Sequence, residues 1–403
     1  MDIKFKSIDD VDLKGKKVLL RVDLNSPIDH DKKDLRDDPR IRAAAPTVKA
    51  LNDTALVVVA HQGRPGKDDF TSLEAHAKHL QRYVDQEVHF VDDVFGDKAV
   101  KAIKELKVGE VLVLDNVRGF LPDNEQMSYE EASNTELVKT LAPLFDYFVN
   151  DAFGAAHRGQ PSLIGWPTLL AGPLVAKELK ALQKVMVNPD RPMAMLVGGA
   201  KAGDKFKAIK YNIEHGIADK ALVAGLTAIL LYEASGKATG DANKKIIAKD
   251  LEKHGEAVMA FMEKKGDKVV LPVDFAYEKD GKRAEVPLAD LPGLNVETGD
   301  LGSASIEAFK KELVSAKTII ANGPPGIFEK EIFRQSTMDM IDAMIASGAY
   351  TVIGGGEMGT AAEESGKADK ISFISTGGGA MLEFLGGKEL PLFQALARSV
   401  NKF

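Results

Sequence analysis

The 403-residue sequence contains no cysteine and a single tryptophan. The absence of cysteine excludes disulfides, cysteine nucleophiles and thiolate metal sites, and it fits a reducing compartment. No stretch approaches the ~18 apolar residues that a membrane-spanning helix needs. The segment Met1–Asp10 is charged and lacks the apolar core of a signal peptide. These absences predict a cytoplasmic protein that does not enter a membrane.

A G-x-x-x-x-G-K-[ST] motif is also missing, which excludes a Walker-type P-loop. The net charge of −7 at pH 7 argues against nucleic acid as the main ligand. The composition, with 44% apolar residues, 28% charged residues and 36 glycines, is typical of a globular α/β protein. Eight of the twelve arginines lie before residue 160. Because arginine suits two-pronged binding of phosphate or carboxylate, this imbalance predicts an anion site in the first half.

Four apolar runs of the first half end in polar clusters that contain arginine or histidine. Segments with helical spacing lie between them, so we expect a doubly wound, mostly parallel sheet. Ligands of such sheets bind at the carboxyl ends of the strands. One arginine after a strand is usually a surface residue, but four of four favour a convergent cationic site. The expected strands are Lys17–Val22, Ala55–Ala60, Val111–Leu114 and Tyr147–Val149, and the expected helices are Arg40–Leu51, Ser72–Val84, Lys98–Leu106 and Glu130–Leu141.

The second half uses glycine and lysine instead. Met193–Val197 reads as a strand, Gly198-Gly199 as a tight turn and Gly203–Ile213 as a helix, with Lys201 and Lys205 close to the turn. The free N–H groups at such a helix start attract phosphate. The alternative interpretation is an ordinary turn with two solvated lysines.

Further expected strands of this half also run into glycine. Triple glycines at two successive strand ends favour backbone contacts to phosphate over simple strand termination. Leu169–Val187 reads as a helix that connects the two halves, and 253–302 reads as polar and irregular. The strands are Ala221–Ala224, Thr318–Ala321, Tyr350–Ile353 and Ile371–Ile374, followed by Gly225, Asn322–Glu329, Gly354–Glu357 and Ser375–Gly379.

The segment Gly354–Gly359 formally matches the dinucleotide motif G-x-G-x-x-G. The acidic residue expected about 20 positions later is absent, because Ser375-Thr376-Gly377 stands there instead. Too little chain remains for a dinucleotide fold, which argues against a dehydrogenase.

Eight motifs in order resemble the phosphoglycerate kinase family along nearly the whole chain. Any one of them would be modest evidence, whereas eight at plausible spacings are specific. The run A-H-R-G-Q-P-S-L looks more like the archaeal branch. The motifs are R-V-D-L-N-S-P (Arg21–Pro27), P-R-I-R (Pro39–Arg42), H-Q-G-R-P (His61–Pro65), N-V-R (Asn116–Arg118), N-D-A-F-G-A-A-H-R (Asn150–Arg158), G-G-A-K-A-G-D-K (Gly198–Lys205), N-G-P-P-G-I-F-E (Asn322–Glu329) and S-T-G-G-G-A (Ser375–Ala380).

The resemblance implies two doubly wound (Rossmann-like) α/β domains that face a cleft and are joined by a connector helix. The N-terminal domain (1–168) would bind 3-phosphoglycerate, and the C-terminal domain (189–385) would bind the magnesium nucleotide. The interdomain helix would be 169–188, and the tail 386–403 would return to the N-terminal domain. We expect a monomer, with a dimer left open.

The resemblance also assigns roles to the matching residues. Of the substrate-binding set, Asp23 and Asn25 would hold the glycerate end, with Arg40 near the transferring group. The stationary phosphate would be held by His61, Arg64, Arg118 and Arg158, with Arg21 close by. The nucleotide set is Gly199, Lys201, Lys205, Gly225, Asn322, Glu329, Gly354, Gly355, Gly356 and Glu357, and the groups expected at the transferring phosphoryl group are Arg40, Lys201, Gly378 and Gly379.

The implied reaction transfers a phosphoryl group reversibly between 1,3-bisphosphoglycerate and ADP, with Mg²⁺ held at Glu357. The bacterial and eukaryotic pattern has aspartate at that position, so the glutamate is a departure that leaves open whether the metal is bound directly or through water. The acceptor carboxylate is ionised at pH 7, so no general base is needed. In-line transfer, neutralisation of the phosphoryl oxygens and hinge closure that excludes water are the expected means. A sensor that binds the same metabolites without transfer is the alternative.

Overall fold

The structure is a computed structural model that describes residues 3–31 and 34–403. Its internal contacts divide the described chain into two compact units. The N-terminal unit comprises residues up to Lys180 together with Glu389–Phe403, and the C-terminal unit comprises Ala181–Lys388. The division falls inside helix α7 (Pro173–Met186). Each unit is described by itself.

The N-terminal unit is built on a six-stranded parallel sheet with the order β5-β6-β4-β1-β7-β8. The central strands are made of valine and leucine and are buried on both faces, as parallel strands require. A two-stranded hairpin, β2 with β3, lies outside this sheet. The strands are β1 (Lys17–Arg21), β2 (Ile28–Asp29), β3 (Asp34–Leu35), β4 (Ala55–Val59), β5 (Glu87–Val91), β6 (Glu110–Leu114), β7 (Tyr147–Asn150) and β8 (Leu170–Ala171).

Alternate residues of each central strand serve different faces. Val18 and Leu20 of β1 join a core with Ile41 and Val48 of α1, whereas Arg21 belongs to the other parity. The α-helices are α1 (Pro39–Ala50), α2 (Glu74–Gln81), α3 (Asp97–Glu105), α4 (Tyr129–Ser133), α5 (Glu136–Leu141), α6 (Pro161–Ile164) and α17 (Pro391–Ser399), and the 3₁₀ turns are η1 (Ile8–Asp10), η2 (Val117–Gly119), η3 (Leu121–Asn124), η4 (Ala142–Leu144), η5 (Phe153–Ala155) and η9 (Val400–Lys402).

The C-terminal unit has a second six-stranded parallel sheet, with the order β11-β10-β9-β15-β16-β17. A smaller antiparallel sheet has the order β13-β12-β14. The strands are β9 (Met193–Val197), β10 (Lys220–Val223), β11 (Val269–Val270), β12 (Asp274–Lys279), β13 (Lys282–Pro287), β14 (Thr298–Leu301), β15 (Thr318–Asn322), β16 (Tyr350–Gly354) and β17 (Phe373–Ser375).

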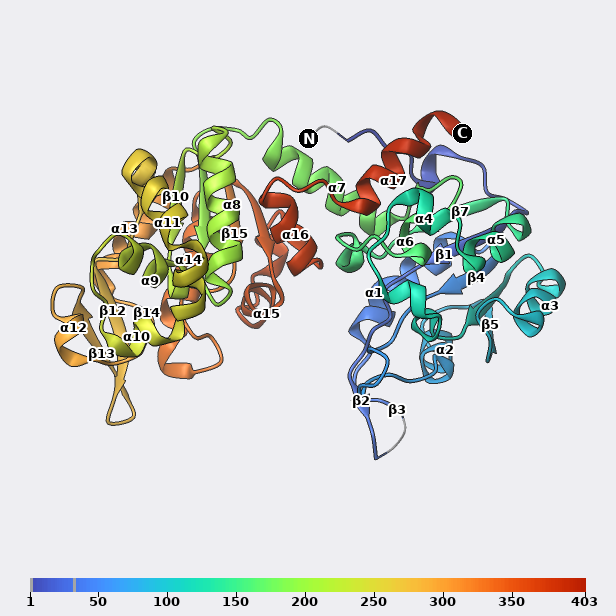
Figure 1. Cartoon of the computed structure of the whole chain (residues 1–403), viewed down its shortest axis with the longest axis horizontal. Coiled ribbons are helices and arrows are strands. Elements are labelled where there is room, and N and C mark those ends of the chain that lie inside the picture. The colour runs from blue at the N-terminus through green and yellow to red at the C-terminus, as the bar shows by residue number, and fades with distance from the viewer. Residues whose placement is uncertain (1–2, 32–33) are drawn as a thin grey trace. The chain divides into compact units, whose positions relative to one another are not determined.

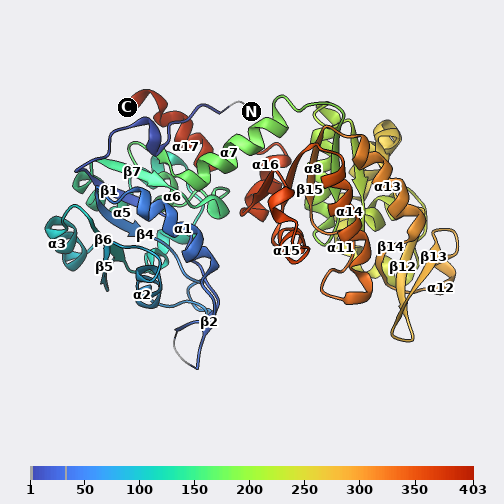
Figure 2. The same ribbon diagram turned by 180° about the vertical axis from the view of Figure 1, so that it is seen from behind.

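One face of the C-terminal sheet packs on α13, α14 and α15 through a core of apolar side chains such as Phe309 and Met344. Figures 1 and 2 show the two parallel sheets, each with its own helices. The remaining helices are α8 (Ala202–Glu214), α9 (Gly225–Ala234), α10 (Asp241–Ile246), α11 (Ala248–Lys265), α12 (Leu291–Leu294), α13 (Ser303–Ser315), α14 (Gln335–Ala346), α15 (Gly356–Glu364) and α16 (Gly378–Leu385), with 3₁₀ turns η6 (Gly266–Lys268), η7 (Glu331–Phe333) and η8 (Ala368–Lys370).

The expected α/β class with two parallel sheets is confirmed. Counted within its own sheet, the C-terminal order is 3-2-1-4-5-6, the order of dinucleotide-binding folds, whereas the N-terminal order is 3-4-2-1-5-6. In both sheets the chain first adds strands on one side of the first strand and then returns to its other side. That reversal lies between β1 and β7 in one unit and between β9 and β15 in the other. A crevice for ligands forms at the carboxyl ends of strands around such a point.

Three local expectations are wrong, two of them about helices. The helix expected over Leu169–Val187 begins only at Pro173, because Leu170–Ala171 pairs as β8 and proline favours the first helical position. The helix expected over Glu130–Leu141 is two helices, interrupted at Asn134 and Thr135, which cap them.

The region expected to be irregular, 253–302, instead holds most of α11 and the antiparallel sheet of β12, β13 and β14. Edge strand β5 was not expected from the sequence. No helix among the described residues is both long and apolar enough to span a membrane.

The segment Glu389–Phe403 packs within the N-terminal unit. The ring of Phe393 stacks on Phe153 at 6.1 Å, and the N–H of Leu392 donates to the Ala156 carbonyl at 3.2 Å. Phe403 stacks on Tyr147 of β7 at 6.2 Å. In Figures 1 and 2 helix α17 therefore lies in red among the blue and green elements.

Candidate active site

Polar side chains from four strand ends of the N-terminal unit line one cavity of about 520 Å³. The strands β4, β1 and β7 are neighbours and parallel, so the segments that follow them meet at one edge of the sheet. Seven of the eight residues expected at the substrate lie in this lining, and Lys67 and Asp69 join them. The expected residues in the lining are Asp23, Asn25, Arg40, His61, Arg64, Arg118 and Arg158.

Arg21 is the expected residue that the lining does not include. It is the last residue of β1 and is fully buried, with its guanidinium bonded to the ring of His61, to Ser162 and to the Val22 carbonyl. Arg21 therefore lies behind the cavity, in contact with a residue that lines it.

The cavity concentrates positive charge. Burial, and then the neighbouring Arg158 and Arg21, lower the pKa of Arg118 to about 10. Burial and the surrounding arginines lower the pKa of His61 well below its ordinary value, so His61 is neutral at pH 7. These shifts mean that cations are held close together with too little anionic charge to balance them. An anion in the cavity would relieve that repulsion.

Two buried N–H groups in the lining have no hydrogen-bond partner within the described chain, Nε of Arg118 and Nη1 of Arg158. Such donors are costly to leave unpaired in a folded protein, so water or a ligand must accept from them. Arg40 is about half exposed, with 49% of its side chain accessible, and forms an ion pair with Asp23. Asn25 accepts a hydrogen bond from the Gly63 N–H at 2.7 Å through its carbonyl oxygen, which leaves its amide N–H groups for a ligand.

In the C-terminal unit the turn after β9 has the geometry of an anion site. Lys201 is exposed, lies in the left-handed region at φ 61° and immediately precedes α8. Lys205 is buried, and its ammonium donates to the Gly198 carbonyl. Burial lowers the pKa of Lys205 to about 8; nearby Glu357 acts against that shift and Lys201 adds to it. The two lysines and the glutamate therefore share one electrostatic environment.

A second cavity, of about 310 Å³, is lined by Gly199, Gly225, Glu329 and Glu357 of the expected nucleotide set. Glycine is required at position 225, because φ is 55° and a Cβ would lie 2.7 Å from the Gly199 nitrogen. Apolar residues make much of the remaining wall, which suits the faces of a nucleotide base. They include Ile246, Phe275, Leu301, Pro324 and Ile327.

The other expected nucleotide residues lie outside this lining. Asn322, Gly354 and Gly355 nevertheless lie together, because Cβ atoms built on Gly354 and Gly355 would fall 3.1 and 4.0 Å from the Asn322 amide nitrogen. That nitrogen is buried and has no partner within the described chain. Gly378 approaches the same place, since its Cβ would lie 3.3 Å from the Cα of Gly355.

Two helices begin at these glycines. Gly356 is the first residue of α15 and Gly378 the first of α16, with Gly379 directly after it. Their unpaired N–H groups make this end of the sheet attractive to phosphate.

Parts of the walls of both cavities were not predicted from the sequence. Ile246, Phe275 and Leu301 come from α10, β12 and β14, next to or within the region expected to be irregular. The alternation of Phe275 and Tyr277 in D-F-A-Y-E does indicate a strand at β12. Lys67 and Asp69 directly follow H-Q-G-R-P-G and could have been included with it.

Glu357 is the residue expected to bind metal. It is exposed in the first turn of α15 and lines the nucleotide cavity. A single carboxylate fits Mg²⁺, which commonly takes one or two carboxylates and completes its shell with phosphate oxygens and water.

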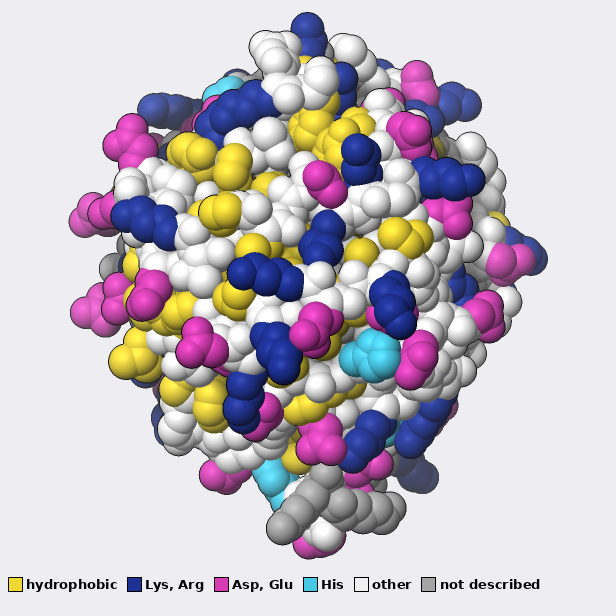
Figure 3. All heavy atoms as spheres, turned by 90° about the vertical axis from the view of Figure 1, so that its right-hand side faces the viewer, with side chains coloured by type: hydrophobic (Ala, Val, Ile, Leu, Met, Phe, Trp, Pro, Cys, Tyr) yellow, Lys and Arg dark blue, Asp and Glu magenta, His cyan; other side chains and the backbone are white. Residues whose placement is uncertain are grey.

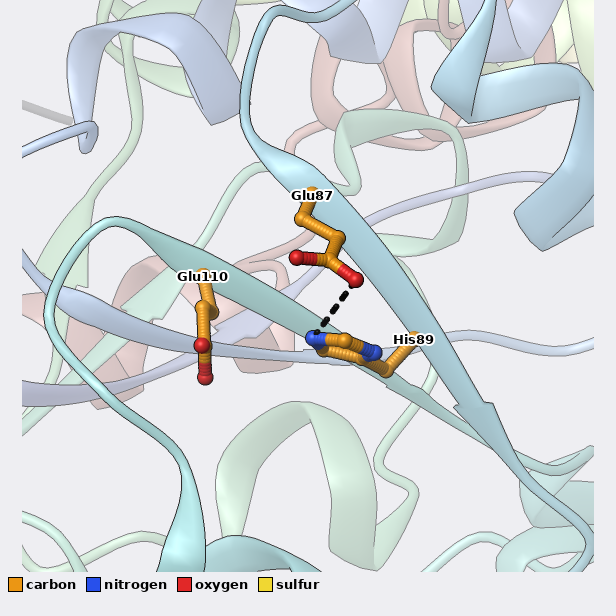
Figure 4. Close-up of side chains that lie close together, drawn as sticks. All are labelled: Glu87, His89 and Glu110. Atoms are coloured by element: carbon orange, nitrogen blue, oxygen red, sulfur yellow. Dashed lines mark ion pairs between the residues drawn. The ribbon is translucent and has the colours of Figure 1, made fainter.

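A separate group of possible metal ligands, Glu87, His89 and Glu110, lies elsewhere and is drawn in Figure 4. Their ligand atoms lie within 4.8 Å of one another. Glu87 and Glu110 are the first residues of β5 and β6, at the edge opposite to the strand ends that line the cavity. The Glu87 side chain is 73% exposed. Because of that position, the group of Glu87, His89 and Glu110 is not part of the candidate active site.

On the face of the N-terminal unit drawn in Figure 3, positive and negative side chains are interspersed.

Comparisons with known proteins agree with this geometry. The sequence model of the family described as phosphoglycerate kinase matches residues 8–388. Phosphoglycerate kinase of Methanothermus fervidus is 40% identical over 399 residues, covering 98% of this chain and 97% of that protein. Phosphoglycerate kinase of Methanococcus maripaludis is 41% identical over 410 residues, covering 99% of both. Both organisms are archaea, in line with the branch expected from the sequence.

Solved structures give the same result. The crystal structure of phosphoglycerate kinase from Pyrococcus horikoshii has a TM-score of 0.88 and 36% identity, covering 99% of this chain and all of that one. The structure of phosphoglycerate kinase from Coxiella burnetii has a TM-score of 0.82 and 31% identity, covering 98% of this chain and 100% of that one.

Proposed function

Since this chain belongs to the phosphoglycerate kinase family, we propose that its N-terminal unit holds the phosphoglycerate and its C-terminal unit the magnesium nucleotide. The chain is a phosphotransferase of the glycolytic reaction, in which 1,3-bisphosphoglycerate and ADP give 3-phosphoglycerate and ATP, and the reverse. The division between the units follows from the kinds of groups that each cavity offers.

The observation that carries the first half of the proposal is the pair of orphaned N–H groups on Arg118 and Arg158. They lie in the lining of a cavity that also holds His61 and Arg64. A phosphate dianion gives several acceptor oxygens to such donors, and hydrogen bonds between charged groups are strong. These four residues grip the stationary 3-phosphate.

The other end of the substrate meets Asp23, Asn25 and Arg40. Asp23 accepts a hydrogen bond from the glycerate hydroxyl, and the amide of Asn25 donates to the carboxyl end. Arg40 is exposed enough to move from Asp23 to the phosphoryl group during transfer. The acceptor is a carboxylate that is already ionised, so positioning and charge neutralisation suffice without a general base.

In the C-terminal unit Lys201 and Lys205 meet the nucleotide phosphates, and Glu329 meets the ribose. Gly199 and Gly225 allow the nucleotide to approach the backbone. N–H groups for the phosphoryl group in transit come from Asn322, from Gly354 at the end of β16, and from the glycines around the starts of α15 and α16, Gly355, Gly356, Gly378 and Gly379.

Mg²⁺ bound with the nucleotide neutralises phosphate charge, and Glu357 is the residue that would hold it. Because glutamate is one methylene longer than aspartate, its carboxylate would bind the metal either directly or through a water. Lys205 lies near Glu357, so the carboxylate is also balanced by an ammonium group before a nucleotide binds.

Each unit provides for one substrate, so transfer requires a hinge movement that brings the two substrates into line and excludes water. Small-angle scattering tests this part: the radius of gyration should fall chiefly when both ligands are present, and equal compaction with one ligand contradicts it. The proposal also places the protein in the cytoplasm, as a monomer or, alternatively, a dimer.

A coupled assay of ATP-dependent phosphorylation of 3-phosphoglycerate tests the function directly. Turnover that requires Mg²⁺ supports the proposal. Binding of both ligands without turnover would instead identify a metabolite sensor.

A further inference from the structure

A buried chain of hydrogen bonds runs behind the substrate cavity to His61. Arg21 stands in its middle, with no accessible surface. Its Nη2 lies 3.0 Å from Nδ1 of His61, and its Nε lies 3.1 Å from Oγ of Ser162. Nη1 donates to the carbonyl of Val22. All three nitrogens of this guanidinium are therefore used by the protein itself.

The direction of the bond to His61 is fixed by chemistry. A guanidinium has only donors, so Nδ1 of His61 must accept, and it cannot carry a hydrogen. The imidazole is then neutral with its hydrogen on Nε2. The lowered pKa of His61, caused by burial and the surrounding arginines, agrees with the neutral form.

The far end of the chain is fixed in the same way. Asp123 of η3 is fully buried and accepts two hydrogen bonds from Ser162 of α6, from its N–H at 2.7 Å and from its hydroxyl at 2.9 Å. Burial raises the pKa of Asp123 to about 6, while Arg21 and the bonds from Ser162 act against that rise. Nε of Arg21 can only donate to Oγ of Ser162, which leaves the hydroxyl hydrogen of Ser162 for the carboxylate. Ser162 therefore accepts from Arg21 and donates to Asp123.

Every hydrogen in this chain has one consistent position. We propose that Asp123, Ser162 and Arg21 are positioning residues that hold His61 in the Nε2–H tautomer, so that it donates a hydrogen bond to the stationary phosphate of the substrate. The proposal rests on the function given above and deepens it. Arg21 does not touch the substrate and acts through the imidazole.

The arrangement solves an electrostatic problem of the cavity. Arg64, Arg118 and Arg158 already line it, and a cationic histidine would add to their repulsion. A neutral N–H donor with a fixed direction adds a contact to phosphate without adding charge. Asp123 meanwhile offsets the charge of Arg21, which water cannot reach.

The first experiment reads the tautomer directly. Long-range ¹H–¹⁵N spectra of the whole enzyme, labelled at histidine, distinguish the two neutral tautomers from the cation, and His61→Gln identifies the signal. We expect the wild type at pH 7 to show His61 only as Nε2–H. In Arg21→Gln the amide oxygen can accept from Nδ1, so the Nδ1–H tautomer should appear. A wild-type His61 that is cationic or protonated at Nδ1 would overturn the proposal.

The second experiment uses Ser162→Ala, which removes the hydroxyl link and is small enough to preserve the fold. The KM for 3-phosphoglycerate should rise roughly tenfold, the size of one weakened hydrogen bond to a charged group, with the KM for MgATP and kcat nearly unchanged. Ser399→Ala is the matched control, since Ser399 is equally buried in the same unit and bonds only to its own helix, at the Ala395 carbonyl.

A loss of stability in Ser162→Ala with an unchanged KM for 3-phosphoglycerate would mean that the chain of hydrogen bonds is only structural, and would overturn the proposal. The spectrum does not depend on turnover. A failed kinase assay would therefore reject the proposed function while leaving the tautomer measurement valid, so the two failures can be told apart.

Discussion

The two proposed phosphate sites are built by different means. The N-terminal cavity is lined by charged side chains that leave four different strand ends, whereas the C-terminal site consists of backbone turns, helix starts and an apolar wall with two lysines. Side-chain cations give a strong grip on an anion that stays in place. Backbone N–H groups give contact without a fixed charge, which suits a group that must be released to either partner.

The same contrast shows in the titrating groups. In the N-terminal unit burial and mutual repulsion lower the pKa values of Arg118 and His61. In the C-terminal unit Lys205 carries the comparable shift, and a carboxylate, Glu357, opposes it. The first site therefore gathers more cations, with several arginines beside His61, whereas the second has two lysines beside one glutamate. Four experiments test this contrast.

Loss of Lys201 should give the largest effect. If the C-terminal site acts on the phosphoryl group in transit, Lys201→Ala should lower kcat by roughly 10²–10³, about 2.7–4 kcal/mol, with little change in substrate affinity. Steady-state kinetics measures it, with Lys207→Ala as control, because Lys207 is exposed on the helix that follows Lys201 and pairs with Asp204 of that helix. An unchanged kcat would remove Lys201 from the chemical step.

Acid should destabilise the N-terminal unit through His76. Burial lowers the pKa of this fully buried histidine to about 4, from 6.5 when unfolded. Its contribution to stability is complete above pH 6.5 and is lost as the pH falls toward 4, because the unfolded chain takes up the proton first. Relative to His76→Gln, the free energy of unfolding of the wild type should fall by about 3 kcal/mol from pH 7 to pH 4.

Denaturant unfolding at several pH values measures this difference. His254→Gln is the matched variant of the C-terminal unit, because His254 is only partly buried. Equal pH dependence of the two variants would contradict the contrast between the units.

Removing one arginine of the N-terminal cavity should weaken the binding of one ligand and not of the other. Arg158→Ala should weaken binding of 3-phosphoglycerate by about 1.5–3 kcal/mol, roughly 10- to 150-fold, and leave MgADP affinity intact. Arg64→Ala should behave similarly but less strongly, since Arg64 is exposed. Titration calorimetry with each ligand is the measurement, and exposed Arg36, which lies outside the lining, serves as the control position. Weaker MgADP binding alone would reverse the assignment of the units.

The smallest effect is expected at Glu357. Glu357→Gln keeps the size and removes the charge, so the Mg²⁺ concentration for half-maximal rate should rise several-fold, with little change in Tm. If the carboxylate only favours the helix start, stability should fall by about 0.3–1 kcal/mol while magnesium dependence stays the same. A changed magnesium dependence would therefore support the metal role, and a loss of stability alone would support the helix-start role.

The polar part of the site could be predicted because strand ends and chemistry-bearing residues are visible together. Arg64, Arg118 and Arg158 each follow an apolar run, and parallel strands bring such ends to one edge. The apolar walls could not be predicted, because Ile246 and Phe275 have the same character as core residues. Their role depends on which elements meet, and that depends on the whole chain.

Arg21 shows a subtler limit. The family resemblance placed it close to the residues that would hold the stationary phosphate, and it ends the strand that leads to Asp23 and Asn25. The alternation of β1 places it on the face of Leu19 rather than at the open end of the sheet, and α6 then covers it. The alternation of side chains along β1 can be read from the sequence, but the packing of α6 over Arg21 cannot. Strand β8 is a similar case, because its two residues count as a strand only through their pairing with β7.

The packing of Glu389–Phe403 against the N-terminal unit has a consequence for biosynthesis. A ribosome makes most of this unit first, then all of Ala181–Lys388, and only afterwards the helix that carries Phe393. Until then Phe153 and Tyr147 lack their stacking partners. The half of the molecule that is translated earliest is therefore completed last, and a nascent chain arrested near residue 388 should expose an unfinished N-terminal unit to proteases even while the C-terminal unit is already folded.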